Sequence, residues 1–158
     1  LCGRELQKSI KDSSKRLIDD AIDRLGLSAA FVSTETEIRG PHDSLFLFSG
    51  IKGNANGIKS MEGITTFWGD EAQAFSQSSI DTLVPTIRKP GSRLIWTWNP
   101  DLETDPVNAM FRGEAGPPPQ SIVREINYYD NPWFPDVLRL ELEYDRGRDV
   151  DKYNHIWL

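Results

Sequence analysis

The stretch Ile64-Thr65-Thr66-Phe67-Trp68-Gly69-Asp70-Glu71-Ala72-Gln73 joins a short run of β-prone residues to two adjacent carboxylates. β-branched and aromatic residues favour strands, so the run predicts a strand that ends near Asp70. Successive side chains on a strand point to opposite faces, so both carboxylates can serve one site only if the strand ends there. Small and polar residues follow, and residues 78–87 are predicted to form a helix. The stretch therefore predicts a strand, a turn that carries acid groups, and a helix.

A strand that ends in Asp-Glu is typical of the Walker B motif of P-loop ATPases. In that motif the Asp helps to hold Mg²⁺, and the Glu polarises the water that attacks the γ-phosphate. Asp-Glu pairs are also common on solvated surfaces. On their own, Asp70 and Glu71 leave both a catalytic and a surface interpretation open.

The next predicted strand, residues 93–98, ends at Asn99-Pro100. Proline stops a strand because its φ is fixed and it has no N–H to donate. An Asn at that position, one strand after the Asp-Glu strand, is well placed to sense a γ-phosphate or its water. The alternative is an ordinary turn opener. Two neighbouring strands that both end in suitable polar groups favour a nucleotide site.

Along the rest of the chain, predicted strands alternate with predicted helices, which favours a mostly parallel sheet covered on both faces. The apolar stripe of residues 10–25 predicts a helix that Gly26 ends. Residues 113–120, with three consecutive prolines, predict a linker. Residues 130–135 predict a turn with an aromatic anchor. The remaining predicted elements are strands at 31–34, 36–39, 45–48 and 121–129 and a helix at 137–144, with a turn at 41–43 that contains His42.

Composition sets broader limits. The 158 residues are 38% hydrophobic, which suits a globular protein, and no apolar run approaches the roughly 20 residues of a membrane span. Cys2 is the only cysteine, so an internal disulfide is excluded, and it reads as a buried strand residue. Residues 1–100 hold 12 basic and 12 acidic residues, whereas residues 101–158 hold 6 and 12, the entire net charge of −6. No basic patch is apparent, so the composition does not argue for nucleic-acid binding.

The segment from Gly53 to Ser60 comes close to a phosphate-binding loop, G-x-x-x-x-G-K-[ST], but Ile58 separates the second Gly from Lys59. Such a loop needs a helix that starts at the Lys, so that helix N–H groups face the phosphates. Gly63 and the Asp-Glu strand follow too soon for that helix. A Gly/Asn connection is therefore the favoured interpretation of this segment.

Taken together, several short motifs resemble the large terminase subunit of tailed bacteriophages, the ATP-driven motor that packs DNA into the capsid. The resemblance covers the whole chain, and it depends on the order and spacing of the motifs. The motifs are 2–9 (CGRELQKS), 48–50 (FSG), 58–60 (IKS), 68–72 (WGDEA), 86–88 (TIR), 99–100 (NP) and 130–132 (DNP).

The resemblance implies an ATPase with Mg²⁺ and ATP as its cofactor and substrate. Asp70 would contact Mg²⁺ and the nucleotide, Glu71 would be the catalytic carboxylate, and Asn99 would belong to the coupling motif after the Walker B strand. Candidate arginine fingers are Arg4, Arg39 and Arg88. Implied partners are double-stranded phage DNA, the portal protein, the small terminase subunit and further copies in a ring on the portal. The implied location is the bacterial host cytoplasm and, transiently, the procapsid portal, without a membrane.

The implied fold is an incomplete RecA-like P-loop NTPase core of the α/β class, followed by a small linker subdomain. The family's Walker A loop is expected upstream of Leu1 and its nuclease domain after Leu158. We therefore expect residues 1–112 to be part of the ATPase domain, and residues 113–158 to be its end and a linker region. Such a piece alone is expected to be inactive.

Other interpretations stay open. A helicase-like P-loop ATPase would share the Asp-Glu strand, and a catalytically inactive fragment derived from a prophage would share the whole pattern. A metal-dependent nuclease is less well supported, because such enzymes need carboxylates from several elements and only one pair stands out here.

Overall fold

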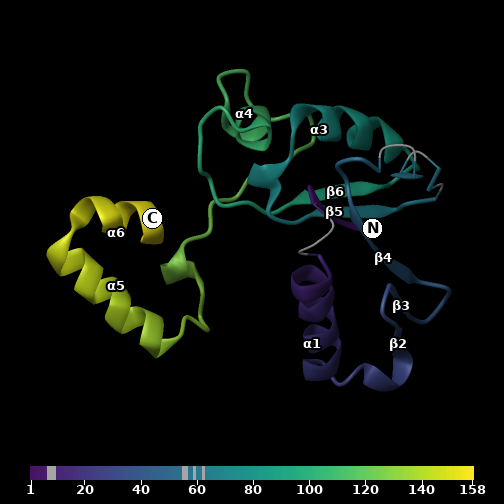
Figure 1. Ribbon diagram of the computed structural model, residues 1–158, viewed down its shortest axis with the longest axis horizontal. Coiled ribbons are helices and arrows are strands. Elements are labelled where there is room, and N and C mark those ends of the chain that lie inside the picture. The colour runs from purple at the N-terminus through teal and green to yellow at the C-terminus, as the bar shows by residue number, and fades with distance from the viewer. Residues whose placement is uncertain (7–9, 55–56, 59, 62) are drawn as a thin grey trace. The chain divides into compact units, whose positions relative to one another are not determined.

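The computed structural model describes residues 1–6, 10–54, 57–58, 60–61 and 63–158. It consists of two compact units, a first unit from Leu1 to Pro118 and a second unit from Pro119 to Leu158 (Figure 1). The first unit contains the sheet and the second contains only helical elements among its regular structure.

A six-stranded sheet in the order β2-β3-β4-β1-β5-β6 forms the centre of the first unit. Strands β4, β1, β5 and β6 are parallel, whereas β2 and β3 are joined to the sheet by antiparallel pairs. The predicted α/β class with a mostly parallel sheet is thus confirmed. The strands are β1 (Cys2–Arg4), β2 (Val32–Ser33), β3 (Glu37–Arg39), β4 (Leu45–Gly50), β5 (Thr66–Gly69) and β6 (Arg93–Trp96).

Helices lie on both sides of this sheet, with α3 and α4 on one side and α1 on the other (Figure 1). The predicted helix at 78–87 is present as α3 followed by one 3₁₀ turn, η5. Pro85 lies in that turn and has no N–H to continue the α-helical pattern. The helical elements of the first unit are η2 (Lys11–Lys15), α1 (Arg16–Arg24), η3 (Ser28–Ala30), η4 (Ala72–Ala74), α3 (Gln77–Leu83), η5 (Val84–Thr86) and α4 (Pro106–Arg112).

The core lies between the sheet and α3, α4 and η4. Phe67 of β5 is fully buried, and its ring packs edge-on against Phe75 and Trp96, with centroids 6.5 and 5.4 Å away. A Cβ at Gly3 would come within 2.7 Å of the Phe67 ring, so this position of β1 has to be glycine. The buried cluster is Ile51, Ile58, Phe67, Ala72, Phe75, Ile80, Leu83, Ile87 and Val107.

The apolar stripe at 10–25 is helical as predicted, and Gly26 at φ 69° ends the helix. The helix begins as a π-helical turn, η2, and continues as α1. The apolar side chains of α1 are not buried in the described structure; Leu17, for example, is 59% exposed. The stripe therefore predicts the helix correctly. Ile10, its first residue, is fully buried, whereas no residue of α1 is.

The second unit differs from the prediction in a strand that is absent and a helix that was not expected. Residues 121–127 form no strand, because none of the described strands pairs with them and their alternating apolar side chains, such as Ile122, are exposed. The predicted helix at 137–144 is present within α5 (Asp136–Arg148). Helices α4 and α6 (Val150–Trp157) were not predicted; α6 carries a recognisable start signal, since the Asp149 side chain accepts a hydrogen bond from Lys152 N.

A small aromatic group stabilises the second unit. Tyr128 of η6 (Tyr128–Asp130) packs on Phe134, which in turn meets Trp157 of α6. The predicted aromatic anchor at 130–135 is therefore Phe134, while Trp133 remains 84% exposed. Leu142 of α5 is the buried apolar residue of this unit.

Candidate active site

Polar side chains from three parallel strands converge at the carboxyl edge of the sheet. Arg4 ends β1, Asp70 directly follows β5, and Thr97 directly follows β6. The register pairs Gly3 with Gly69 and Gly69 with Trp96, so the three strands end at the same level. Ligands of open α/β sheets bind outside the carboxyl ends of the strands. This edge is therefore the expected position of a ligand-binding or catalytic site.

Asp70 is the centre of the polar network. Its Oδ2 accepts hydrogen bonds from Arg4 Nε at 2.9 Å, Arg4 Nη2 at 2.6 Å and Ser14 Oγ at 2.7 Å. From the part of the chain that the structure describes, its Oδ1 receives one long hydrogen bond, from Thr97 Oγ1 at 3.3 Å. The Arg4 and Asp70 side chains are 15% and 17% exposed, so this pair is mostly withdrawn from water. Among the described residues, Oδ2 therefore accepts three hydrogen bonds, whereas Oδ1 accepts a single weak one.

The network keeps Asp70 ionised. Burial by itself would raise the pKa of Asp70, but the hydrogen bonds from Ser14 and Arg4, together with the positive charge of Arg4, outweigh burial. The pKa of Asp70 is therefore below its ordinary value. A carboxylate held in its charged form is the state that a cation requires.

Glu71 lies at a strained turn. Its backbone is left-handed, with φ 53° and ψ 49°, a conformation that non-glycine residues adopt rarely and at a cost of about 1–3 kcal/mol. Flanking hydrogen bonds impose it, from Asp70 N to Gly3 O and from Ala72 N to Thr97 O, each 2.9 Å. The turn directs the Glu71 side chain outward, where it is 49% exposed.

The Glu71 carboxylate stays close to the network. Its Oε1 is 3.6 Å from Arg4 Nη2, and its Oε2 accepts a hydrogen bond from Gln73 Nε2 at 2.7 Å. The structure therefore brings Asp70 and Glu71 together, one partly buried and paired, the other at the surface. Two adjacent carboxylates in such different surroundings can take different roles.

Asn99 is not brought into the network. Its side chain is exposed and makes no hydrogen bond to either carboxylate among the described residues. Thr97, two residues earlier, makes the connection instead: its N–H donates to Gly69 O at 2.9 Å and its hydroxyl reaches Asp70. Among the described residues, the side chain that reaches Asp70 from the end of β6 is therefore that of Thr97.

Ser14 and Thr97 are the residues that sequence reasoning did not identify. Thr97 could have been found, because it precedes Asn99-Pro100 at the end of the same predicted strand. Ser14 carries no comparable signal, since it is 56 residues from Asp70 in the chain and lies in a helical turn. Only the fold brings it to the carboxylate.

The donor set fits a magnesium ion that is shared with a nucleotide. Mg²⁺ prefers oxygen ligands and is usually held by one or two carboxylates together with substrate phosphates. Asp70 Oδ1 is such an oxygen, and Glu71 is close by. Among the described residues no cluster of three or more His, Cys, Asp or Glu side chains could hold a metal by itself. The protein alone therefore offers a partial site.

The segment that resembles a phosphate loop makes local contacts where it is described. Ile58 is fully buried in the core, and the Ser60 hydroxyl donates to Gly57 O at 2.7 Å. Lys59 lies outside the described residues. A buried Ile58 agrees with the interpretation of this segment as a connection that packs on the core.

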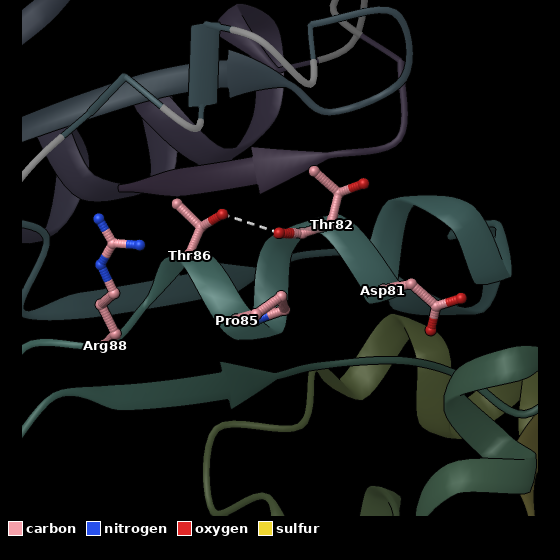
Figure 2. A pocket seen from close by; sticks show the side chains of 5 residues that line it. All are labelled: Asp81, Thr82, Pro85, Thr86 and Arg88. Carbon is pink, nitrogen blue, oxygen red and sulfur yellow. Dashed lines mark hydrogen bonds between the residues drawn. The ribbon is translucent and has the colours of Figure 1, made fainter.

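Of the three candidate arginine fingers, Arg4 is the one that contacts Asp70. Arg39 of β3 pairs with Glu37, with Nε 2.6 Å from Oε1. Arg88 lines an open hollow of about 360 Å³ together with Asp81, Thr82, Pro85 and Thr86 (Figure 2). Because α3 leads from the end of β5 back to the start of β6, this hollow lies at the opposite end of the sheet from Asp70.

Two further predictions concern single residues. Cys2 is buried in β1 as predicted, and burial raises the pKa of its thiol to about 11, so it is not a thiolate nucleophile at neutral pH. His42 lies in the turn before β4 with φ 55°, which confirms its place as a turn residue. Neither residue belongs to the site.

Among the described residues, no helix has the length and apolar character needed to cross a bilayer.

Comparison with known proteins gives the family. No curated protein matches the chain. The model of the family described as phage terminase large subunit matches residues 1–158, the entire chain. The chain therefore belongs to the phage terminase large subunit family, whose members act in packaging phage DNA.

Proposed function

We propose that this chain is the ATP-hydrolysing motor segment of a terminase large subunit, with a RecA-like P-loop core that drives DNA into the capsid. The observation that carries the proposal is the convergence of Asp70, Glu71 and the end of β6 at the carboxyl edge of a parallel sheet. Family membership supports an ATPase in general. The geometry adds an ionised carboxylate beside an exposed one.

In this proposal each of the three predicted site residues has a role that follows from its surroundings. Glu71, exposed at the turn, orients the water that attacks the γ-phosphate and accepts its proton. Asp70 would hold Mg²⁺ together with the nucleotide phosphates, and that ion would neutralise charge on the phosphates. Asn99 would report the nucleotide state from the loop after β6. The end of that strand is tied to Asp70 and Gly69 by the hydroxyl and the N–H of Thr97.

The wider assembly is part of the same proposal. Double-stranded phage DNA, the portal protein and the small terminase subunit are the proposed partners, and the working form is a ring of copies at the portal in the host cytoplasm. Residues 1–112 would belong to the ATPase domain and residues 113–158 to its end and linker. The net charge of −6 does not itself favour DNA binding, so the DNA partner is proposed from the family.

The test is Glu71→Gln in the complete terminase large subunit, because the segment alone is expected to be inactive. The substitution keeps the shape of the side chain and removes its charge. We expect kcat for ATP hydrolysis to fall about 10²–10⁴-fold, because the general base is lost. Binding of ATP, measured by equilibrium titration, should stay close to that of the wild type. Glu114→Gln is the matched control, since it removes the same charge from an exposed turn of the first unit.

Two results would contradict the assignment. Hydrolysis by Glu71→Gln within a few-fold of the wild type would remove Glu71 from the mechanism. Equal losses in Glu71→Gln and Glu114→Gln would show that the change in net charge, and not the position of the carboxylate, is responsible.

A further inference from the structure

The two oxygens of the Asp70 carboxylate have very different surroundings. Among the described residues, Oδ2 accepts three short hydrogen bonds, two from the Arg4 guanidinium and one from Ser14, whereas Oδ1 receives one at 3.3 Å from Thr97. A carboxylate oxygen offers about two lone-pair positions, so three donors leave no room for a further ligand at Oδ2. Any additional ligand of Asp70 must approach Oδ1.

The two donors that saturate Oδ2 are themselves held in place. Ser14 is 1% exposed, and its π-helical turn is closed by the hydrogen bond from Lys15 N to Ile10 O at 3.2 Å. The carbonyl oxygen of Arg4 accepts a hydrogen bond from Ile51 N at 2.9 Å, and this bond fixes the end of β1. The Nε and Nη2 groups of a guanidinium form a rigid planar fork. The orientation of Asp70 is therefore set by donors that have little freedom to move.

We propose that Arg4 and Ser14 are positioning residues that hold Oδ2 of Asp70 and so present Oδ1 to the metal that accompanies the nucleotide. This inference rests on the proposed function, in which Asp70 contacts Mg²⁺. It assigns Arg4 to the orientation of a metal ligand in its own subunit, in place of the arginine-finger role considered from the sequence. Partners that orient a metal ligand typically contribute 10–100-fold to metal affinity.

A competing arrangement makes the opposite prediction. The guanidinium of Arg4 is a cation 2.6 Å from Oδ2 and 3.6 Å from Glu71 Oε1. If Arg4 instead occupied the position that the metal needs, its removal would strengthen metal binding. The sign of the change in metal affinity therefore separates positioning from competition.

The experiment uses the complete terminase large subunit and measures Mn²⁺ binding directly, by titration followed by electron paramagnetic resonance, in the presence of a non-hydrolysable ATP analogue. The variants are Ser14→Ala, Ser14→Thr, Arg4→Lys and Asp70→Asn, each checked by a thermal melt. Thr82→Ala is the control, because it removes a hydroxyl that donates to Ser78 O, away from the site. The Mg²⁺ concentration for half-maximal ATP hydrolysis is measured in parallel.

We expect Ser14→Ala to weaken Mn²⁺ binding about 10-fold or more, and Ser14→Thr, which restores the hydroxyl, to stay within about 2-fold of the wild type. Arg4→Lys keeps the charge but lacks the planar fork, so it should weaken binding as Ser14→Ala does. If Ser14→Ala fails to fold, the comparison of Arg4→Lys with the wild type still decides the matter.

Three outcomes would overturn the inference. Wild-type Mn²⁺ affinity in Ser14→Ala and Arg4→Lys, with weaker binding in Asp70→Asn, would refute positioning and leave the metal role of Asp70 intact. Tighter binding in Arg4→Lys would identify Arg4 as a competitor of the metal. Unchanged binding in Asp70→Asn would remove the metal site of the proposed function, and this inference would fall with it.

Discussion

The two units of the chain use buried groups differently. Of the thirteen apolar residues that are buried in the described part of the chain, twelve lie in the first unit. Its polar network at the sheet edge is held by strand ends whose positions are fixed by that core. The second unit buries Leu142 and, beside it on α5, Asp145, which accepts hydrogen bonds from Lys152 Nζ and Trp157 Nε1. A precise site needs rigid support, and the first unit provides it.

The second unit also leaves large apolar side chains strongly exposed. In the second unit Ile122, Trp133, Val137 and Leu140 are each at least 75% exposed. A forty-residue unit has too little interior to bury its apolar groups, since the buried fraction of a chain falls with its length. We therefore expect the first unit to be the more stable of the two, and the following variants test that difference.

The largest effect is expected for Phe67→Ala in the first unit. Phe67 is fully buried among Phe75, Trp96 and the surface of Gly3, so its truncation leaves a cavity and should cost about 3–5 kcal/mol. The measurement is urea unfolding, with hydrogen exchange of peptides to locate the change. Exchange should rise in β1, β5 and β6, and ATP hydrolysis should fall because the strand ends shift. Unchanged exchange at these strands would contradict this account of the core.

A smaller effect is expected for Leu142→Ala in the second unit. Leu142 is 1% exposed, and its truncation should cost about 2–4 kcal/mol, with less surrounding core to hold a cavity open. Peptides of α5 and α6 should exchange faster while those of the sheet stay unchanged. Trp133→Ala is the control, since a side chain that is 84% exposed should change stability by less than about 0.5 kcal/mol. Faster exchange in the sheet would mean that the units do not behave separately.

The smallest effect concerns pH and returns to the first unit. Because the pKa of Asp70 is lowered in the folded state, its carboxylate stabilises the fold above the unfolded pKa of about 3.9 and stops doing so as pH falls through the folded pKa. Asp70→Asn should therefore lower stability at pH 7 and lose less stability than the wild type on acidification.

Urea midpoints at neutral and acidic pH measure this difference. Asp101→Asn serves as the control, because its carboxyl is exposed and its loss removes the same charge. If Asp70→Asn and Asp101→Asn show equal acid dependence, the network around Asp70 contributes nothing specific to the stability of the first unit.

By itself, the sequence determined the local elements whose patterns are strong. The run before Asp70 predicted β5, the run before Asn99 predicted β6, and the stripe at 10–25 predicted a helix ended by Gly26; all three are present. The spacing of apolar residues and the residues that end a helix or strand act over only a few positions. Such local signals can therefore be recognised from the sequence. The order and spacing of the short motifs, which include the carboxylates at the end of β5, likewise indicated the terminase family. The family match confirms this prediction.

The tertiary structure alone decided which distant residues meet. Ser14 and Arg4 reach Asp70 across 56 and 66 positions, and Thr97 rather than Asn99 makes the contact from β6. The strand predicted at 121–129 failed because a strand needs a partner, which no local pattern supplies. Contacts between strand ends depend on sheet order and register, and these are set by the packing of the whole core around Phe67.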